Sequence, residues 1–146
     1  MNKYPNFNVF NNAISSDTST KDFYIDSENI GACSLLKRIN LQQKSIKVEC
    51  IDMDSVISNL NLNHIDICKI DTEGTALDVL KSFGKQINIV RSLQLESEIQ
   101  KSWESQSLYP DIRDFLQNNN FVEVLFCRLG NTQIDAFWVN EKYTRN

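Results

Sequence analysis

The sequence predicts an α/β domain with a mostly parallel sheet and an antiparallel hairpin at one edge. From residue 45 onward, strand-like and helix-like segments alternate before two strands close the chain, an order typical of α/β folds. Residues 65–70 form an apolar run of strand length, as expected of a parallel strand covered on both faces. A short turn around Gly130 joins the last two strands, which predicts the hairpin.

Composition limits the classes of function. The 146 residues are enough for a single domain, residues 1–146, with its own core. The net charge of −4 and the scattered lysines and arginines argue against nucleic-acid binding, which needs a clustered positive face. No apolar run reaches the roughly 20 residues that cross a bilayer, and the first residues lack the apolar core of a secretory signal. We therefore expect no membrane partner and a cytoplasmic location.

The four cysteines do not indicate a metal site. Cys33, Cys50, Cys68 and Cys127 are far apart and form no C-x-x-C pair, so a zinc knuckle is not expected. Cys50, Cys68 and Cys127 fall in predicted strands, and we expect them to be buried, reduced thiols of a cytosolic protein.

The first half of the chain is predicted to supply three strands and a helix. The expected elements are, in order, a strand at 6–15, a turn-rich break at 16–20, a short strand at 22–25, a loop at 26–32 and a strand at 45–51. Phe7 and Val9 alternate along the first strand and are expected to face inward. Asp52 or Asp54 then opens a short helix that extends to Leu60.

The centre of the chain combines a buried strand with a turn that carries two acids. The strand at 65–70 ends at Asp71, and Glu73 and Gly74 follow directly. Gly74 can adopt backbone conformations that are closed to other residues. Because ligands in open α/β sheets bind beyond the carboxyl ends of the strands, Asp71 and Glu73 are the first candidates for a functional site.

The remaining elements continue the alternation. Thr75 and Asp78 match the S/T-x-x-D/E pattern of a capping box, which predicts a helix at 75–83. The apolar residues at helical spacing that should lie on the sheet are Leu77, Leu80, Phe83 and Ile87. The later elements are a strand at 88–96, a helix at 109–116 and strands at 121–127 and 134–139. The strand at 88–96 ends in Glu96, so a third acid is expected at the same edge of the sheet.

The acid-bearing turn and its surroundings resemble a known enzyme family. The turn region reads Lys69-Ile70-Asp71-Thr72-Glu73-Gly74, followed by Leu77, Val79 and Leu80. This segment resembles the K-I-D-x-E-G signature, and the helix after it, of the FkbM family of S-adenosylmethionine (SAM)-dependent methyltransferases. Other segments that resemble this family are Asn12-Ala13-Ile14-Ser15, Met53-Asp54-Ser55-Val56-Ile57, Ile65-Asp66, Gln94-Leu95-Glu96 and Asp135-Ala136-Phe137-Trp138-Val139. The resemblance covers nearly the whole chain. It implies a Rossmann-like class I methyltransferase fold, SAM as the cofactor, and a hydroxyl of a sugar or polyketide-like small molecule as the methyl acceptor.

Two departures from the family pattern limit what the resemblance implies. The family usually has a second acid two residues after the signature glycine, where this chain has Ala76. The glycine-rich turn of the SAM-binding front half is not visible, because no two of the chain's four glycines are at G-x-G spacing. The resemblance therefore implies a partial fold, a C-terminal fragment that begins at the family's third strand, and leaves the cofactor-binding residues unknown.

The partial fold has a physical consequence for the strand at 65–70. In the family's fold the missing strands lie between the third and fourth strands, so this strand becomes an exposed apolar edge. Such an edge favours pairing with another chain. We expect the chain to self-associate or to need a partner chain that completes the sheet.

Methyl transfer to a hydroxyl assigns roles to four residues. The acceptor oxygen must be aligned and its proton removed. Asp71 is the first candidate for the base or the orienting group and Glu73 is the second, while Glu96 and Lys69 are candidates for binding the substrate. The structural alternatives are a helix-capping acid for Asp71, a solvated strand end for Glu96 and an ion pair for Lys69, and for Lys69 we favour the ion pair.

Other interpretations fit the same residues. Asp71, Glu73 and Glu96 can hold a divalent cation, because hard cations take carboxylate oxygens, but the spacing requires none and we expect no metal. The missing glycine-rich turn favours a non-catalytic remnant or subunit that acts as an interaction module. A carboxylate-based hydrolase using Asp71 with Glu96 is a third interpretation, against which the resemblance speaks. His64, the only histidine, is expected in a surface loop.

Overall fold

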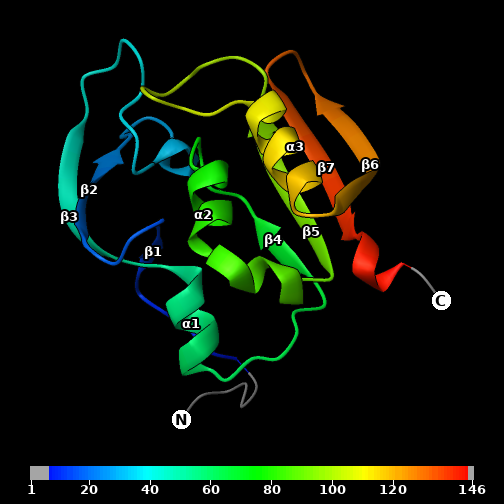
Figure 1. Ribbon diagram of the computed structural model, residues 1–146. Helices are drawn as coiled ribbons and strands as arrows, with labels where there is room; N and C mark the ends of the chain where they lie inside the picture. Colours follow the sequence, from blue (N-terminus) through cyan, green and yellow to red (C-terminus); the bar gives the residue numbers. More distant parts are fainter. Residues whose placement is uncertain (1–6, 145–146) are drawn as a thin grey trace.

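The computed structural model describes residues 7–144, which fold into two small sheets and three helices (Figure 1). The first sheet has the strand order β1 (Ala13–Ile14), β3 (Lys44–Ile51), β2 (Thr20–Ile25). The second sheet has the order β4 (Cys68–Ile70), β5 (Ser92–Glu98), β7 (Gln133–Asn140), β6 (Phe121–Leu129). The strands predicted near 22–25, 45–51, 121–127 and 134–139 are confirmed, each with slightly longer bounds.

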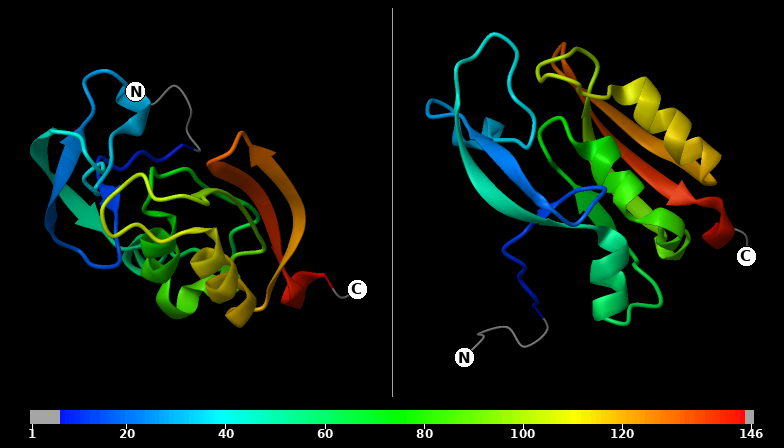
Figure 2. Two further views of the ribbon diagram at one scale, coloured as in Figure 1. Left: turned by 90° about the horizontal axis from the view of Figure 1, so that it is seen from above. Right: turned by 60° about the vertical axis from the view of Figure 1, so that its left-hand side comes forward.

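The helices are α1 (Met53–Asn59), α2 (Ala76–Ser82) and α3 (Tyr109–Asn118), and shorter 3-10 segments lie at η1 (Ile30–Ala32), η2 (Gly84–Ile89) and η3 (Glu141–Tyr143). Two of the helices, α2 and α3, build the core by packing on the second sheet, and α1 packs against α2 and η2. Figure 2 shows α2 and α3 side by side against this sheet, with the first sheet to one side. The predicted core residues are confirmed as buried: Leu77, Leu80, Phe83 and Ile87. They pack with Leu93, Leu95 and Trp138 of the strands, each 0% exposed.

The prediction of a mostly parallel sheet is wrong. Among residues 7–144, β1 with β3 and β4 with β5 are the parallel pairs, and the other three pairs are antiparallel. The reason is that β7 lies between β5 and β6, so the closing hairpin contributes two antiparallel pairs to a sheet of four strands. The hairpin itself is confirmed, with β6 at the edge of the sheet.

The strand predicted at 6–15 is reduced to the two residues of β1. Residue 6 lies outside the described residues, and residues 7–12 form no strand. Phe7 and Val9, which were expected to face inward, are 60% and 76% exposed. β3 pairs only with Ala13 and Ile14 of this segment, so no sheet surface is available to bury the earlier residues.

Two strands of the second sheet begin later than predicted. β4 starts at Cys68, and Ile65 contributes only an isolated parallel bridge to Val90. Residues 88–89 belong to η2, which follows α2 directly, so β5 begins at Ser92 and runs on to Glu98. The sequence predicted Glu96 as the last residue of this strand. In the structure Glu96 is instead an interior residue of β5.

The two predicted helix starts differ in outcome. Asp52 caps α1, because its side chain accepts a hydrogen bond at 2.7 Å from the backbone N–H three residues later. The capping box of Thr75 and Asp78 does not form. Asp78 instead accepts hydrogen bonds from the Ser15 hydroxyl and the Ser16 N–H, at 3.1 Å each. The acid thus ties α2 to the segment after β1.

The cysteines follow the predicted pattern in part. Cys50 is buried and Cys68 is half-buried, but Cys127 is exposed. The expectation for Cys127 fails because β6 is an edge strand whose second half faces solvent. All four cysteines are free thiols.

Among residues 7–144, no helix combines the length and the apolar character that a membrane span requires.

Replacing Asp52 with alanine is expected to lower the free energy of unfolding by about 1 kcal/mol, the usual value of a helix N-cap. Hydrogen bonds from Thr18 and from the Ser55 N–H lower the pKa of Asp52. This contribution is therefore present above the ordinary aspartate pKa and is lost as the pH falls through the lowered value. Urea denaturation of Asp52→Ala at neutral and acidic pH measures both effects. The control is Asp54→Ala, an exposed position in the same helical turn, and an equal loss in both variants would contradict the capping role.

Candidate functional site

The residues after β4 form a tight turn that is held from three sides. Gly74 has a φ of +77°, a conformation that glycine adopts readily. A Cβ at this position would lie 3.1 Å from the indole of Trp103, so the ring packs directly on the glycine. The Ser34 hydroxyl donates a hydrogen bond to the Glu73 carbonyl at 2.5 Å, and the Gly74 N–H donates one to Glu98 at 3.3 Å.

The groups that hold this turn come from distant parts of the chain. Ser34 follows β2 and forms a backbone bridge with Tyr24, so it connects the first sheet to the turn. Trp103 lies in the segment between β5 and α3 and forms an antiparallel bridge with Arg38. Figure 1 shows these two connecting segments, in cyan and yellow, meeting above α2. The turn after β4 is therefore the point at which the two sheets are joined.

Three predicted site residues lie together at this turn. Asp71, Glu73 and Glu96 each place a carboxylate oxygen within 4.8 Å of the other two. Asp71 is exposed, whereas Glu73 and Glu96 are half-buried. The cluster arises because β4 and β5 pair in parallel, with Ile70 opposite Leu95. Residues just after β4 and near the end of β5 therefore meet at one edge of the sheet.

The charged partners of these acids differ. Lys69 forms an ion pair with Asp71 at 2.7 Å, which is the role favoured for Lys69 from the sequence. Glu96 accepts a hydrogen bond from Gln133 at 2.8 Å. The Glu73 carboxylate takes no hydrogen bond from residues 7–144, so it is the member of the cluster that is available to a ligand.

Glu73 also has the most perturbed proton affinity of the cluster. Burial is the main cause, and the neighbouring carboxylates of Glu96, Glu98 and Asp71 add to it, so the pKa of Glu73 rises to about 7. The Arg38 guanidinium acts in the opposite direction. Burial likewise raises the pKa of Glu96 and of Glu98. Carboxylates this close cannot all ionise without mutual repulsion, so Glu73 can hold or release a proton near neutral pH.

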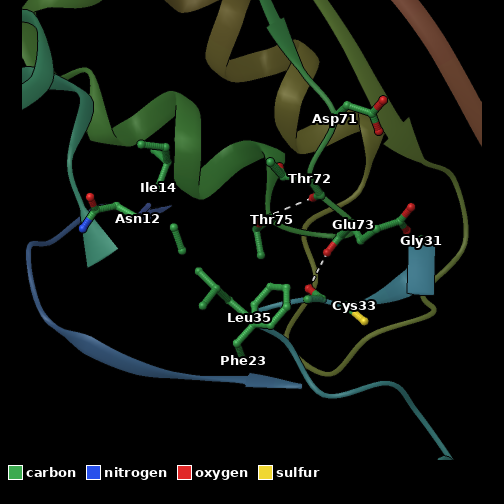
Figure 3. A pocket seen from close by; sticks show the side chains of 12 residues that line it. Asn12, Ile14, Phe23, Gly31, Cys33, Leu35, Asp71, Thr72, Glu73 and Thr75 are labelled. Carbon is green, nitrogen blue, oxygen red and sulfur yellow. Dashed lines mark hydrogen bonds between the residues drawn. The ribbon is translucent and has the colours of Figure 1, made fainter. Parts of the chain in front are cut away.

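Glu73 lies between two cavities. The first, of about 340 Å³, has apolar walls from Ile14, Phe23 and Leu35 and includes Asp71, Glu73 and Thr75. Figure 3 shows Asp71 and Glu73 on one side of this pocket, opposite Asn12 and Ile14. The second cavity, of about 450 Å³, is polar, and its side chains include Arg38, Glu73, Glu96, Glu98, Trp103 and Gln133. The two cavities share Glu73 and Gly31.

Several residues of this region were missed from the sequence. Glu98 lies two residues after Glu96, and the period-2 alternation of a strand places both on the same face, so this residue was open to prediction once the strand was extended. Arg38, Ser34 and Gln133 carry no such signal, because loops or a distant hairpin bring them to the site. Trp103 packs on the turn, since it is 4% exposed and its indole lies against Gly74, and it also lines the polar cavity.

The acid cluster also has the chemical character of a cation site. The carboxylates of Asp71, Glu73 and Glu96 offer oxygen ligands of the kind that hard divalent cations take. The ammonium group of Lys69, 2.7 Å from Asp71, already neutralises one of them.

His64 is about half exposed and interacts with Asn63 and Asp66 away from the cluster, in agreement with the predicted surface position.

The fold and its cavities define an α/β domain that presents carboxylates at the carboxyl end of a parallel strand pair, where α/β enzymes bind their ligands. The family model described as the Methyltransferase FkbM domain matches residues 2–123. This match spans most of the 146 residues, and the chain belongs to the FkbM methyltransferase family. Comparisons with curated proteins and with solved structures gave no match.

Methyltransferases of this family imply SAM, and the described residues fit part of that cofactor. The first cavity has apolar walls that suit the apolar parts of such a ligand, and Asp71 and Glu73 lie along its rim, with their carboxylates directed away from Phe23 and Leu35 (Figure 3). No glycine in residues 7–144 forms a cradle for the remainder of the cofactor. Gly74 is covered by Trp103, Gly31 meets the Asn29 side chain, and Gly84 and Gly130 face open space.

Replacing Gly74 with alanine is expected to destabilise the fold by at least about 2 kcal/mol, since a left-handed backbone strains a side chain and the new Cβ would press on Trp103. Gly130→Ala is the matched control, because Gly130 also has a positive φ, of +61°, but nothing lies within 4 Å of its Cβ position. We expect about 1 kcal/mol for the control. Chemical denaturation of both variants measures the difference, and equal losses would contradict a packed turn.

Proposed function

We propose that this chain transfers a methyl group from SAM to a hydroxyl oxygen of a small polyhydroxylated molecule, such as a sugar or a polyketide-like metabolite. The observation that carries the proposal is the position of Glu73. Glu73 is a lining residue of both cavities, its carboxylate lacks a hydrogen-bond partner among residues 7–144, and its pKa is raised to about 7. A general base works best when its pKa lies near the working pH.

In this proposal Glu73 accepts the proton of the acceptor hydroxyl, and Asp71 and Glu96 orient the acceptor. Bound SAM supplies a methyl group on a positively charged sulfur. The acceptor hydroxyl donates its hydrogen bond to a Glu73 carboxylate oxygen, and Glu73 takes the proton as the hydroxyl oxygen becomes a nucleophile. Asp71, fixed by its ion pair with Lys69, and Glu96, fixed by Gln133, accept hydrogen bonds from neighbouring hydroxyls and orient the acceptor. Lys69 thus contributes to substrate binding through Asp71.

The polar cavity is the proposed acceptor site. Its lining combines the carboxylates of Glu73, Glu96 and Glu98 with the amide of Gln133, groups that exchange hydrogen bonds with hydroxyls. Among residues 7–144, Arg38 is the cation of that lining, and it is paired at 2.8 Å with Asp26. A neutral polyhydroxylated acceptor suits this lining, whereas a phosphorylated acceptor would meet repulsion from the carboxylates. The apolar cavity beside Asp71 is left for the methyl donor.

Replacing Glu73 with glutamine is expected to lower methyl transfer by roughly 100-fold or more, the usual contribution of a general base. Because the ionised form is the base, activity of the unaltered chain should rise with pH and level off above about 7. The assay follows radiolabelled methyl groups from SAM into neutral sugars and into the corresponding sugar phosphates across a pH series. Glu104→Gln, at an exposed position outside both cavities, is the control. Glu73→Gln activity within a few-fold of the control would refute the assigned role.

An interaction module is the second candidate function, and the sheet edges favour it. β4 and β6 are the two edge strands of the second sheet. Ile67 beside β4 is 59% exposed, and Val124 and Leu125 of β6 are 56% and 66% exposed. Exposed apolar edges pair readily with further strands, which supports self-association or a partner chain that completes the sheet.

Light scattering over a concentration series tests this second candidate. We expect the average mass to rise above that of the 16.9 kDa chain as concentration increases. Replacing Leu125 with lysine, a residue that protects natural edge strands, should reduce the association. A constant monomer mass in both proteins would exclude self-association through this edge.

A further inference from the structure

We propose that Glu98 is a positioning residue of this site. Its buried carboxylate accepts a hydrogen bond from the Gly74 N–H, and it adds its own acid to those of Asp71 and Glu96 beside Glu73. Glu98 is absent from the family signature described above and was not predicted from the sequence. The inference rests on the proposed role of Glu73 as proton acceptor, and it adds the residue that fixes where Glu73 lies.

The burial of Glu98 requires an explanation. Its residue is 4% exposed, although burying a carboxylate costs free energy unless hydrogen bonds or charges compensate. Part of that compensation comes from the Gln106 side chain, which lowers the pKa of Glu98, and part from the hydrogen bond that the Gly74 N–H donates at 3.3 Å. No ion pair with Glu98 occurs among residues 7–144. Glu98, the last residue of β5, therefore helps to hold the turn through its hydrogen bond with the Gly74 N–H.

The contact reaches Glu73 through the backbone. Gly74 directly follows Glu73, so the Gly74 N–H and the Glu73 carbonyl belong to one peptide group, and contacts that hold this group fix the backbone from which the Glu73 side chain extends. Ser34 holds the Glu73 carbonyl on one side, Trp103 covers Gly74 on another, and Glu98 holds the Gly74 N–H. Removing Glu98 leaves this N–H buried without a partner, so the turn is expected to open more often.

Glu98 also acts through its charge. The charged groups that face Glu73 are Asp71 on the same turn, Glu96 and Glu98 on β5, and Arg38 on the loop after η1. The three acids favour the protonated form of Glu73, and Arg38 opposes them. Glu98 lines the polar cavity together with Glu73. It therefore helps to keep Glu73 able to bind and release a proton near neutral pH.

Two substitutions separate the hydrogen bond from the charge. Glu98→Gln keeps an oxygen that can accept from the Gly74 N–H but removes the acid, whereas Glu98→Ala removes both. In the full chain, we expect hydrogen exchange of the Gly74 amide to be roughly tenfold faster in Glu98→Ala and nearly unchanged in Glu98→Gln. In both variants, carbon-13 NMR titration should place the pKa of Glu73 lower than in the unaltered chain. Glu104→Gln, which makes the same charge change at an exposed site, should alter neither reading.

The outcomes are decisive without a known acceptor. Gly74 exchange in Glu98→Ala within twofold of the unaltered chain, or an unchanged Glu73 titration in Glu98→Gln, would overturn the proposal. If Glu98→Ala does not fold, the titration of Glu98→Gln decides alone. Because neither reading requires methyl transfer, an inactive chain with the expected shifts would refute the proposed function and leave the positioning role intact.

Discussion

The crowding of four carboxylates around one glycine turn is the constraint on which this site depends. Asp71 and Glu73 lie in the turn after β4, and Glu96 and Glu98 lie in β5. Like charges at this spacing oppose full ionisation. The fold accepts this cost because the turn is held on all sides, by Ser34 from the first sheet and by Trp103 from the segment before α3. Burial and the neighbouring carboxylates raise the pKa of Glu73 at the same turn that joins the two sheets.

This arrangement relates the stability of the domain to its chemistry. A carboxyl whose pKa is higher in the folded than in the unfolded chain weakens folding as the pH rises through that range. Glu73 is such a group, so the site works against the stability of the fold near neutral pH. The apolar cluster under α2 and α3, which includes Leu80, Phe83 and Trp138, supplies the burial that offsets it. Functional sites commonly store strain that the rest of the structure supports.

The sequence predicted the parts of this structure that depend on local pattern. The apolar run before Asp71, the helical spacing of Leu77 to Ile87 and the closing hairpin each follow from short-range periodicity, and they brought Asp71, Glu73 and Glu96 to one edge. The shortened β1, the insertion of β7 beside β5 and the partners of Asp78 depend on contacts between distant segments, which periodicity does not encode. Ser34 and Arg38 were missed for the same reason, since only the folded chain brings them to the turn. Glu98 was missed because the strand was predicted to end at Glu96, whereas β5 continues to Glu98.

The central claim is that Glu73 exchanges a proton near neutral pH because it is partly buried and lies beside other carboxylates. Carbon-13 NMR titration of the glutamate carboxyls, with Glu73→Gln to assign the signal, measures this directly in the unaltered chain. We expect a Glu73 midpoint of about 7, well above the ordinary value of a glutamate carboxyl. A Glu73 midpoint at that ordinary value would contradict the account, because the cluster would then exert no effect on its most central member.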